Sequence, residues 1–202
     1  INNTTSTYET MSEDELTKLI SETNAQVQKL EQRKNELSSQ LNALKDTADK
    51  NEKAAEIAKQ NAQTNGILSG RLAATGEGVV IRISQGSKQK IDSAILFTLL
   101  EELRNSGAEV IEINNVRVVT STYISGTAGS IVCDGTKLKS PFTIRAIGDS
   151  DNLQNAVNLA GGVGSRLKVK YGATVSVSPS DKVMIKSTRQ APQYTYAHVI
   201  GQ

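Results

Sequence analysis

Apolar residues follow two different patterns along the chain. Between residues 11 and 65 they recur every three or four positions among Glu, Lys, Gln and Asn, whereas between 76 and 188 they gather in short runs separated by turn residues. The first pattern is typical of one long amphipathic helix, and the second of short strands and helices. The sequence therefore predicts a helical N-terminal region followed by a separate α+β domain.

The N-terminal region fits a heptad repeat. Ser12 and Glu15 have the spacing of a capping box, and no proline or glycine interrupts the pattern before Gly66. We therefore predict a long helix, or coiled coil, over residues 11–65. The predicted coiled-coil seam consists of Leu16, Ile20, Val27, Leu30, Leu37, Leu41 and Leu44.

The predicted seam leaves the partner of this helix open. Lys34, Asn51 and Asn65 interrupt it, and its C-terminal half is mostly alanine. Charged pairs between the flanking positions, which usually set pairing specificity, are largely missing. Three outcomes are compatible with the pattern: a parallel homodimer, packing against another protein, and a solvated single helix.

The α+β domain begins with a predicted strand and continues with a helix at Ile91–Gly107, for which Asp92 or Ser93 is the expected cap. Asn114–Asn115 and Asp134–Gly135 each separate two apolar runs. Because Asn, Asp and Gly tolerate a positive φ, both pairs predict tight turns between strands.

The remainder of the domain contains a second predicted helix over Asp151–Ala160 and two final strands around a turn at Pro179–Asp181. The element order is then β-α-β-β-β-β-α-β-β, with a β-α-β unit at each end. The simplest architecture for this order is an α+β fold, a sandwich related to the ferredoxin-like fold. We expect this domain to span 76–188, between a linker at 66–75 and a C-terminal tail at 189–202, and we expect residues 1–10 to be flexible.

Composition narrows the range of functions. The net charge is +2 and aromatic residues make up 3% of the chain, so neither a basic surface nor stacking rings favour nucleic-acid binding. The single cysteine, Cys133, has no partner for an intrachain disulfide. No apolar run approaches the roughly 18 residues that span a bilayer. The chain begins with Ile1 and not methionine, which suggests a processed or a trimmed chain and leaves the presence of an anchor open.

No catalytic motif emerges from the sequence. Gly148–Asp151 joins a strand to a helix, but its one glycine and two carboxylates suit a helix N-cap and not a phosphate-binding loop. His198, the only histidine, has no nearby metal ligands in the sequence. Glu101 and Glu102 lie on a predicted helix, where solvation is the simplest interpretation. The sequence therefore predicts no enzymatic activity, no cofactor and no metal site.

One polar segment, residues 120–130, is a candidate for partner binding because hydroxyl groups recur along it beside a tyrosine. The tentative partner-binding residues are Thr120, Thr122, Tyr123 and Ser125. The simpler interpretation is a β connection with a bulge or an irregular turn. Arg117 and Arg145 are candidates to extend a polar face beside this segment.

Three phrases carry a family resemblance: GEGVVIRIS, LLEELRNSGAEVIEINNVRVVTSTYIS and IVCDGTKLKSPFTIRAIGD. The region that contains them, about Gly76–Lys186, resembles the bacterial YlxW/YlxX-type family of unknown function. The resemblance implies an N-terminal membrane anchor, then a coiled coil, then an extracytoplasmic α/β domain. It also implies a layout similar to that of cell-envelope proteins encoded near division genes, and it assigns no functional residues.

These observations favour one function over two others. The favoured function is a non-enzymatic scaffold or interaction module of the cell envelope, extracytoplasmic and anchored by a single membrane span in the full-length protein. Its expected partners are envelope proteins and a second copy paired through the helix. The alternative is a domain that senses a small molecule or a cell-wall fragment. A hydrolase built from dispersed carboxylates ranks below both, and nucleic-acid binding ranks lower still.

Overall fold

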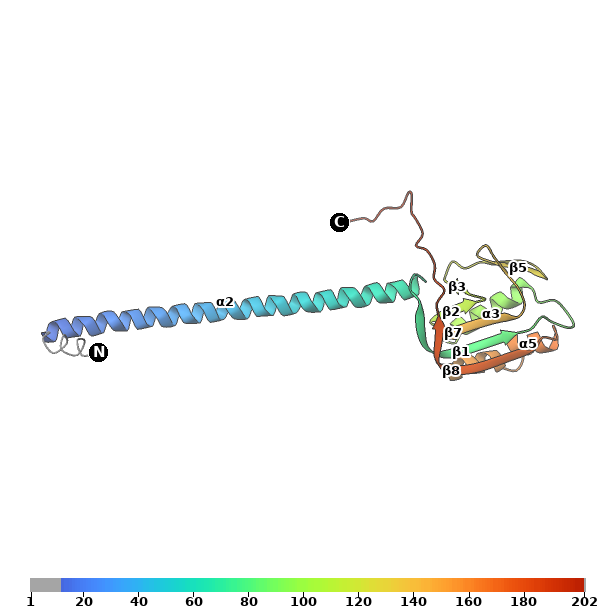
Figure 1. Ribbon diagram of the computed structural model, residues 1–202, viewed down its shortest axis with the longest axis horizontal. Helices are drawn as coiled ribbons and strands as arrows, with labels where there is room; N and C mark the ends of the chain where they lie inside the picture. Colours follow the sequence, from blue (N-terminus) through green and yellow to red (C-terminus); the bar gives the residue numbers. More distant parts are fainter. Residues whose placement is uncertain (1–11, 202) are drawn as a thin grey trace. The chain divides into compact units, whose positions relative to one another are not determined.

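The computed structural model describes residues 12–201, which form one long helix followed by an α+β domain (Figure 1). The α+β class and the long N-terminal helix predicted from the sequence are therefore confirmed. The chain divides into two compact units between Lys59 and Gln60. We call them the helical unit and the globular unit. The flexible segment predicted for residues 1–10 lies outside the described residues.

The long helix α2 (Glu13–Leu68) begins at the predicted capping box. The Ser12 backbone N–H donates to Oε2 of Glu15 at 3.1 Å, and the Glu15 N–H donates to Oγ of Ser12 at 3.3 Å. Lys50 and Asp46 form an i,i+4 ion pair at 3.7 Å. The helix continues through Gly66, where an added Cβ would lie 2.5 Å from Cδ1 of Leu72. Glycine therefore lets the chain after the helix pack closely against its last turns.

Five strands of the globular unit form one antiparallel sheet in the order β3-β2-β7-β1-β8. The strands are β1 (Ala74–Ile83), β2 (Val110–Ile113), β3 (Val116–Val118), β7 (Phe142–Ile147) and β8 (Val175–Ile185). The turn between β2 and β3 has the predicted conformation, because Asn114 and Asn115 have φ values of 46° and 63°.

A second, three-stranded antiparallel sheet is inserted in the chain between β3 and β7. It contains β4 (Ile124–Thr127), β5 (Ser130–Cys133) and β6 (Thr136–Leu138), in that order. The predicted turn at Asp134–Gly135 joins β5 to β6, with φ values of 48° and 83°. Oγ of Ser93, the first residue of helix α3 (Ser93–Asn105), donates to the Gly126 carbonyl at 3.1 Å and links this sheet to the helix.

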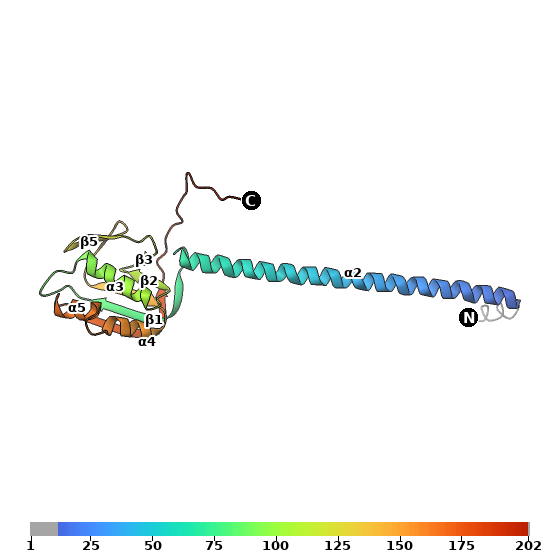
Figure 2. The same ribbon diagram turned by 180° about the vertical axis from the view of Figure 1, so that it is seen from behind.

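Three helices cover one face of the five-stranded sheet: α3 (Ser93–Asn105), α4 (Ser150–Asn158) and α5 (Val163–Val169) (Figure 2). Asp92 caps α3 by accepting from the Ile95 N–H at 2.9 Å, and Asp149 caps α4 by accepting from the Asn152 N–H at 2.8 Å. Both caps were expected from the sequence. The core between helices and sheet includes the fully buried residues Val79, Ile81, Ile83, Leu96, Leu99, Leu103, Ile113, Ile144, Ala146, Leu153, Val163 and Leu167.

The prediction of two final strands around Pro179–Asp181 was wrong, because residues 175–185 form the single strand β8. Proline, which lacks a backbone N–H, is tolerated there because β8 is an edge strand. An edge strand pairs with one neighbour only, here β1, so its outer side has no strand to bond to. The pairing with β1 shifts register between Gly76 and Gly78. Both strands bend at this irregularity, as Figure 1 shows where β8 turns near its C-terminal end.

Candidate interaction site

Arg117, on the edge strand β3, connects three segments of the globular unit. Its side chain is 2% exposed. Nη1 donates to the carbonyl oxygens of Leu72 at 2.9 Å and Ser187 at 3.1 Å, and Nη2 donates to that of Ile67 at 3.0 Å. These carbonyls belong to the last turn of α2, the link before β1 and the segment after β8. Arg117 therefore holds the beginning and the end of the globular unit beside one strand.

The carbonyls of Ile67, Leu72 and Ser187 replace the water that the Arg117 guanidinium loses on burial. Burial lowers the pKa of the Arg117 guanidinium from its usual value, while the nearby Glu112 carboxylate acts in the opposite direction. An arginine remains charged at any physiological pH. A buried charge of this kind is tolerated only when hydrogen bonds replace its lost hydration.

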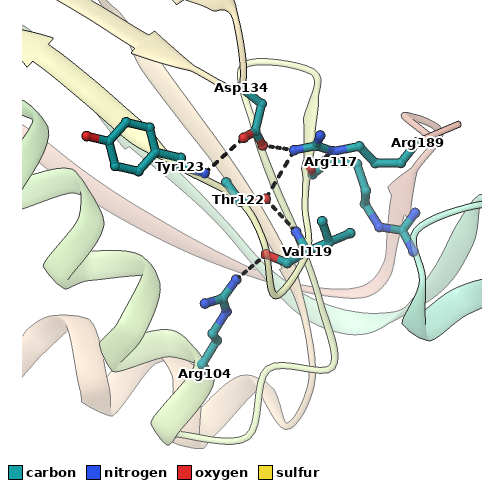
Figure 3. A network of polar contacts seen from close by, with 7 residues as sticks. All are labelled: Arg104, Arg117, Val119, Thr122, Tyr123, Asp134 and Arg189. Atoms are coloured by element: carbon teal, nitrogen blue, oxygen red, sulfur yellow. Dashed lines mark hydrogen bonds and ion pairs between the residues drawn. The ribbon is translucent and has the colours of Figure 1, made fainter. Parts of the chain in front are cut away.

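Arg189, after β8, extends this connection to the loop between β3 and β4. Its backbone N–H donates to the Gly70 carbonyl at 2.7 Å, and its Nε donates to the Arg117 carbonyl at 3.0 Å. Its Nη2 donates to Oγ1 of Thr122 at 3.2 Å and forms an ion pair with Asp134 (Figure 3). One arginine thus joins the segment after β8 to β3, to the loop and to the turn after β5.

The backbone of the β3–β4 loop is held from several sides (Figure 3). The Val119 N–H donates to Oγ1 of Thr122 at 2.7 Å, and the Thr122 N–H donates to the Val119 carbonyl at 2.9 Å. Oδ1 of Asp134 accepts from the Tyr123 N–H at 2.9 Å, and Nη2 of Arg104 on α3 donates to the Val119 carbonyl at 2.8 Å. The loop is therefore a fixed element of the surface.

The four tentative partner-binding residues have different surroundings. The hydroxyl of Thr122 is occupied by contacts inside the loop network, and Ser125 lies in β4 opposite Val132. Thr120 is exposed, and the Tyr123 side chain is 70% exposed with its ring pointing away from the network (Figure 3). The structure thus leaves Thr120 and Tyr123 available to a partner.

No local pattern in the sequence identifies the residues that support this loop. Arg104 belongs to a predicted helix, Asp134 to a predicted turn and Arg189 to the predicted C-terminal tail. Thr120 also borders a shallow hollow of about 200 Å³, which Arg104 and Glu109 line as well. We refer below to Thr120 and Tyr123, on the loop that Arg104, Asp134 and Arg189 hold, as the loop face.

The helical unit presents the predicted seam to solvent. Its members Ile20, Val27, Leu30, Leu37, Leu41 and Leu44 are between 48% and 70% exposed, and Leu16 is partly buried. No side chain between residues 13 and 59 is buried. The seam therefore contacts no second apolar surface in the described part of the chain.

The candidate catalytic carboxylates have structural contacts. Oε1 of Glu101 lies 2.6 Å from Nη1 of Arg104, and Oε1 of Glu102 lies 3.9 Å from Nη2 of Arg166. Cys133 is buried, and burial raises the pKa of its thiol. Glu101 and Glu102 are therefore paired groups on the helix surface, and Cys133 is a core residue.

Within residues 12–201, no group of three or more His, Cys, Asp and Glu side chains is arranged to hold a metal ion. None of the helices described in the same range has the length and apolarity needed to cross a bilayer.

The fold, a long helix followed by an α+β domain with antiparallel sheets, is that of a class of bacterial proteins whose activity is unknown. The chain belongs to the family described as bacterial protein of unknown function (DUF881), whose profile matches residues 61–198. The resemblance to the YlxW/YlxX-type family is confirmed by the UPF0749 protein YlxW of Bacillus subtilis. YlxW is 30% identical over 126 residues, which cover 58% of this chain and 54% of YlxW.

Mycobacterium tuberculosis contains another relative, the UPF0749 protein Rv1825, which is 34% identical over 169 residues. The match covers 82% of this chain and 57% of Rv1825, so the chain spans less than two thirds of that relative. The crystal structure of an uncharacterized conserved protein from Mycobacterium tuberculosis has a similar fold, with a TM-score of 0.63 and 34% identity. That similarity covers 69% of this chain and 99% of the crystallised one.

Proposed function

We propose that this protein is a non-enzymatic scaffold or interaction module of the bacterial cell envelope. In this proposal the native protein is tethered to the membrane, the helical unit pairs with a second copy, and the globular unit binds envelope proteins on the extracytoplasmic side. A link to cell division or wall assembly follows from the layout that the family resemblance implies. The observation that carries the proposal is the exposed seam of α2.

The exposed seam favours a partner helix for a physical reason. Six apolar side chains of one helical stripe are at least 48% exposed, although burying each fully would contribute about 1.5–3 kcal/mol. Their heptad spacing suits another helix with the same spacing. A second copy of the chain has a helix with this spacing. In a parallel pair, Asn51 would face Asn51 of the other copy and form a hydrogen bond across the seam.

The loop face supports the second part of the proposal. Tyrosine is enriched at the centres of protein interfaces because its ring buries a large area while its hydroxyl keeps a polar contact. Here Tyr123 is exposed on a backbone that Arg104, Asp134 and Arg189 hold in place. Little backbone conformational entropy would be lost when a tyrosine on such a preordered loop binds.

The strand order supports a finer assignment of the fold. When the segment β3–β6 and the short helix α5 are left out, the elements of the globular unit follow the order β1-α3-β2-β7-α4-β8 along the chain. In the sheet, the same four strands lie in the order β8-β1-β7-β2. We infer a relation to the ferredoxin-like fold, in which two β-α-β units interleave in this manner. The short helix α5 and the inserted sheet are additions to that plan.

Sedimentation equilibrium of the chain would test the helix pairing. We expect a concentration-dependent dimer that Leu30→Ser converts to a monomer, because the substitution places a hydroxyl in the seam. Leu159→Ser is the matched control, since Leu159 is 64% exposed on the globular unit outside the seam. A wild-type chain that stays monomeric at about 100 μM, well above typical dimer dissociation constants, would remove the pairing from the proposal.

Site-specific photo-crosslinking in cells would test the loop face. A crosslinker at position 123 of the full-length protein is expected to capture a reproducible envelope protein, whereas one at Lys168 on α5 is not. Capture is expected to be lost when Asp134→Ala frees the loop. Equal capture from positions 123 and 168 would contradict a binding role for this face.

A further inference from the structure

The bend shared by β1 and β8 hollows the helix-free face of the five-stranded sheet. At the bend, β1 approaches β7 closely. A Cβ at Gly78 would lie 1.9 Å from the Ala146 carbonyl oxygen, so this position of β1 requires glycine. Beyond the bend, Val183 and Ile185 pack over Val110 and Ile147 on this face. Between the bent strands and the centre of the sheet lies a groove of about 430 Å³.

The side chains that line this groove carry an excess of positive charge. Among the described residues, the groove is lined by Arg145 from β7, Lys182 from β8 and Lys186 just after β8, against a single carboxylate, that of Glu112. The Glu112 side chain is 4% exposed and accepts from Nη1 of Arg145 at 3.1 Å. Glu112 lies between Arg145 on β7 and Arg117 on β3. Arg117 directs its donors to backbone carbonyls and not to Glu112. The groove therefore keeps two uncompensated cations.

The charge of the whole globular unit has the same sign. Residues 60–202 contain 15 Lys and Arg against 10 Asp and Glu, whereas residues 1–59 contain 8 against 11. The small net charge of the chain is thus the sum of an acidic helical unit and a basic globular unit. A positive field around the globular unit would raise the local concentration of anions near the groove.

We propose that this groove binds a phosphate-bearing ligand. Arg145, Lys182 and Lys186 hold the phosphate, and the rest of the ligand rests on the apolar side chains of Val80 and Met184. The buried Glu112 orients the Arg145 guanidinium for this contact. The proposal is independent of helix pairing and of the loop face, so it stands or falls separately from the function proposed above.

The residues present suit a phosphate in number and geometry. Within residues 12–201, Arg145 uses only Nη1 in a protein hydrogen bond, so Nη2 and Nε remain available as a planar pair of donors. Such pairs match two oxygens of one phosphate, and flexible lysines add point charges around it. Val80, Val183 and Met184 provide an apolar wall beside the cations. The volume of the groove lies in the range of about 300–1,000 Å³ typical of small-ligand sites.

An NMR titration of the ¹⁵N-labelled chain with inorganic pyrophosphate would test the site. We expect saturable amide shifts centred on Arg145, Lys182 and Lys186. The double variant Lys182→Ala/Lys186→Ala is expected to weaken binding about tenfold, because two of three charge-assisted contacts are lost. The matched control Lys137→Ala/Lys139→Ala removes the same charge from a different groove and is expected to change affinity less than twofold. The spectra of the variants report directly whether each remains folded.

Two outcomes would overturn the proposal: equal weakening by both double variants, or shifts spread over all surface lysines without saturation. A second arm distinguishes the source of the phosphate. Vesicles of phosphatidylglycerol and phosphatidylcholine are added in place of pyrophosphate, with pure phosphatidylcholine as the blank. Vesicle binding lost only in the Lys182→Ala/Lys186→Ala variant assigns the groove to a lipid headgroup. Vesicle binding lost equally in both variants reflects general surface charge and counts against the groove.

Discussion

The two units of this chain are stabilised in opposite ways. The globular unit buries a continuous core between its helices and its sheet, whereas no side chain between residues 13 and 59 is buried. The stability of the helical unit therefore comes from backbone hydrogen bonds and from i,i+4 pairs worth about 0.2–0.5 kcal/mol each. A partner that buried the seam would add to it. The comparison shows that one chain can contain a part with its own buried core and a part whose apolar stripe stays exposed.

The largest expected effect separates the buried core of the globular unit from the exposed seam of the helical unit. Leu99→Ala in the fully buried part of α3 is expected to lower the free energy of unfolding of the globular unit by about 2–5 kcal/mol, because it leaves a cavity. Urea denaturation followed by the fluorescence of the buried Tyr171 would measure it. Leu30→Ala, in the exposed seam, is expected to change this transition by less than about 0.5 kcal/mol. Equal effects would mean that the two units do not unfold independently.

The next largest effect concerns the hydrogen bonds of Arg117 near the end of α2. Arg117→Met leaves the carbonyls of Ile67, Leu72 and Ser187 without their donor and is expected to destabilise the globular unit by about 3 kcal/mol. Hydrogen exchange is expected to accelerate first at Gly70 and Arg189. Arg82→Met, at an exposed position of the same sheet face, is the control. If both variants lose the same stability, the three carbonyl contacts do not account for the role of Arg117.

A smaller effect concerns the helical unit alone. Lys34→Leu fills the interrupted seam and is expected to tighten self-association about tenfold, equivalent to about 1.4 kcal/mol. Sedimentation equilibrium would measure the change, with Lys29→Leu, off the seam, as the control. Similar gains from both substitutions would point to nonspecific association through added apolar surface.

The smallest effect is a dependence on pH within the globular unit. The Ser150 hydroxyl and N–H donate to Oε1 of Glu77 at 2.7 and 3.1 Å, and these bonds lower the pKa of Glu77 below its model-peptide value of 4.5. A depressed pKa stabilises the fold above the unfolded-state value, and this contribution is lost as the pH falls through the lower folded-state value. Glu77→Gln is therefore expected to flatten the dependence of the urea midpoint on pH below 4.5. An unchanged dependence would contradict the contact.

Local signals in the sequence were sufficient for the turns at Asn114–Asn115 and Asp134–Gly135 and for the helix caps. The positive φ values of the turn residues and the cap bonds of Asp92 and Asp149 involve residues at most three positions apart, although Asn114 and Asp92 also bond to distant segments. The capping box at Ser12 and Glu15 is of the same kind. For these features the chemistry of a few neighbouring residues decides the structure.

Contacts between distant segments could not be predicted in the same way. The bond from Arg117 to the Ser187 carbonyl spans 70 residues, and the bond from Arg189 to Arg117 spans 72. These contacts, and the continuity of β8 through Pro179, depend on strand order and register, which no local pattern determines. The charged groove depends in addition on the bend of two paired strands.

The sheet order also has a consequence for how the protein is made. β1 lies between β7 and β8, which are the last two strands of the chain. A ribosome that adds about 5–20 residues per second needs several seconds to pass from Ile83 to Ile185. Both edges of β1 stay unpaired until β7 has been made, and one edge stays open until β8 follows. An apolar strand with a free edge invites pairing with other chains, so the last strand to be synthesised is the one that removes this hazard.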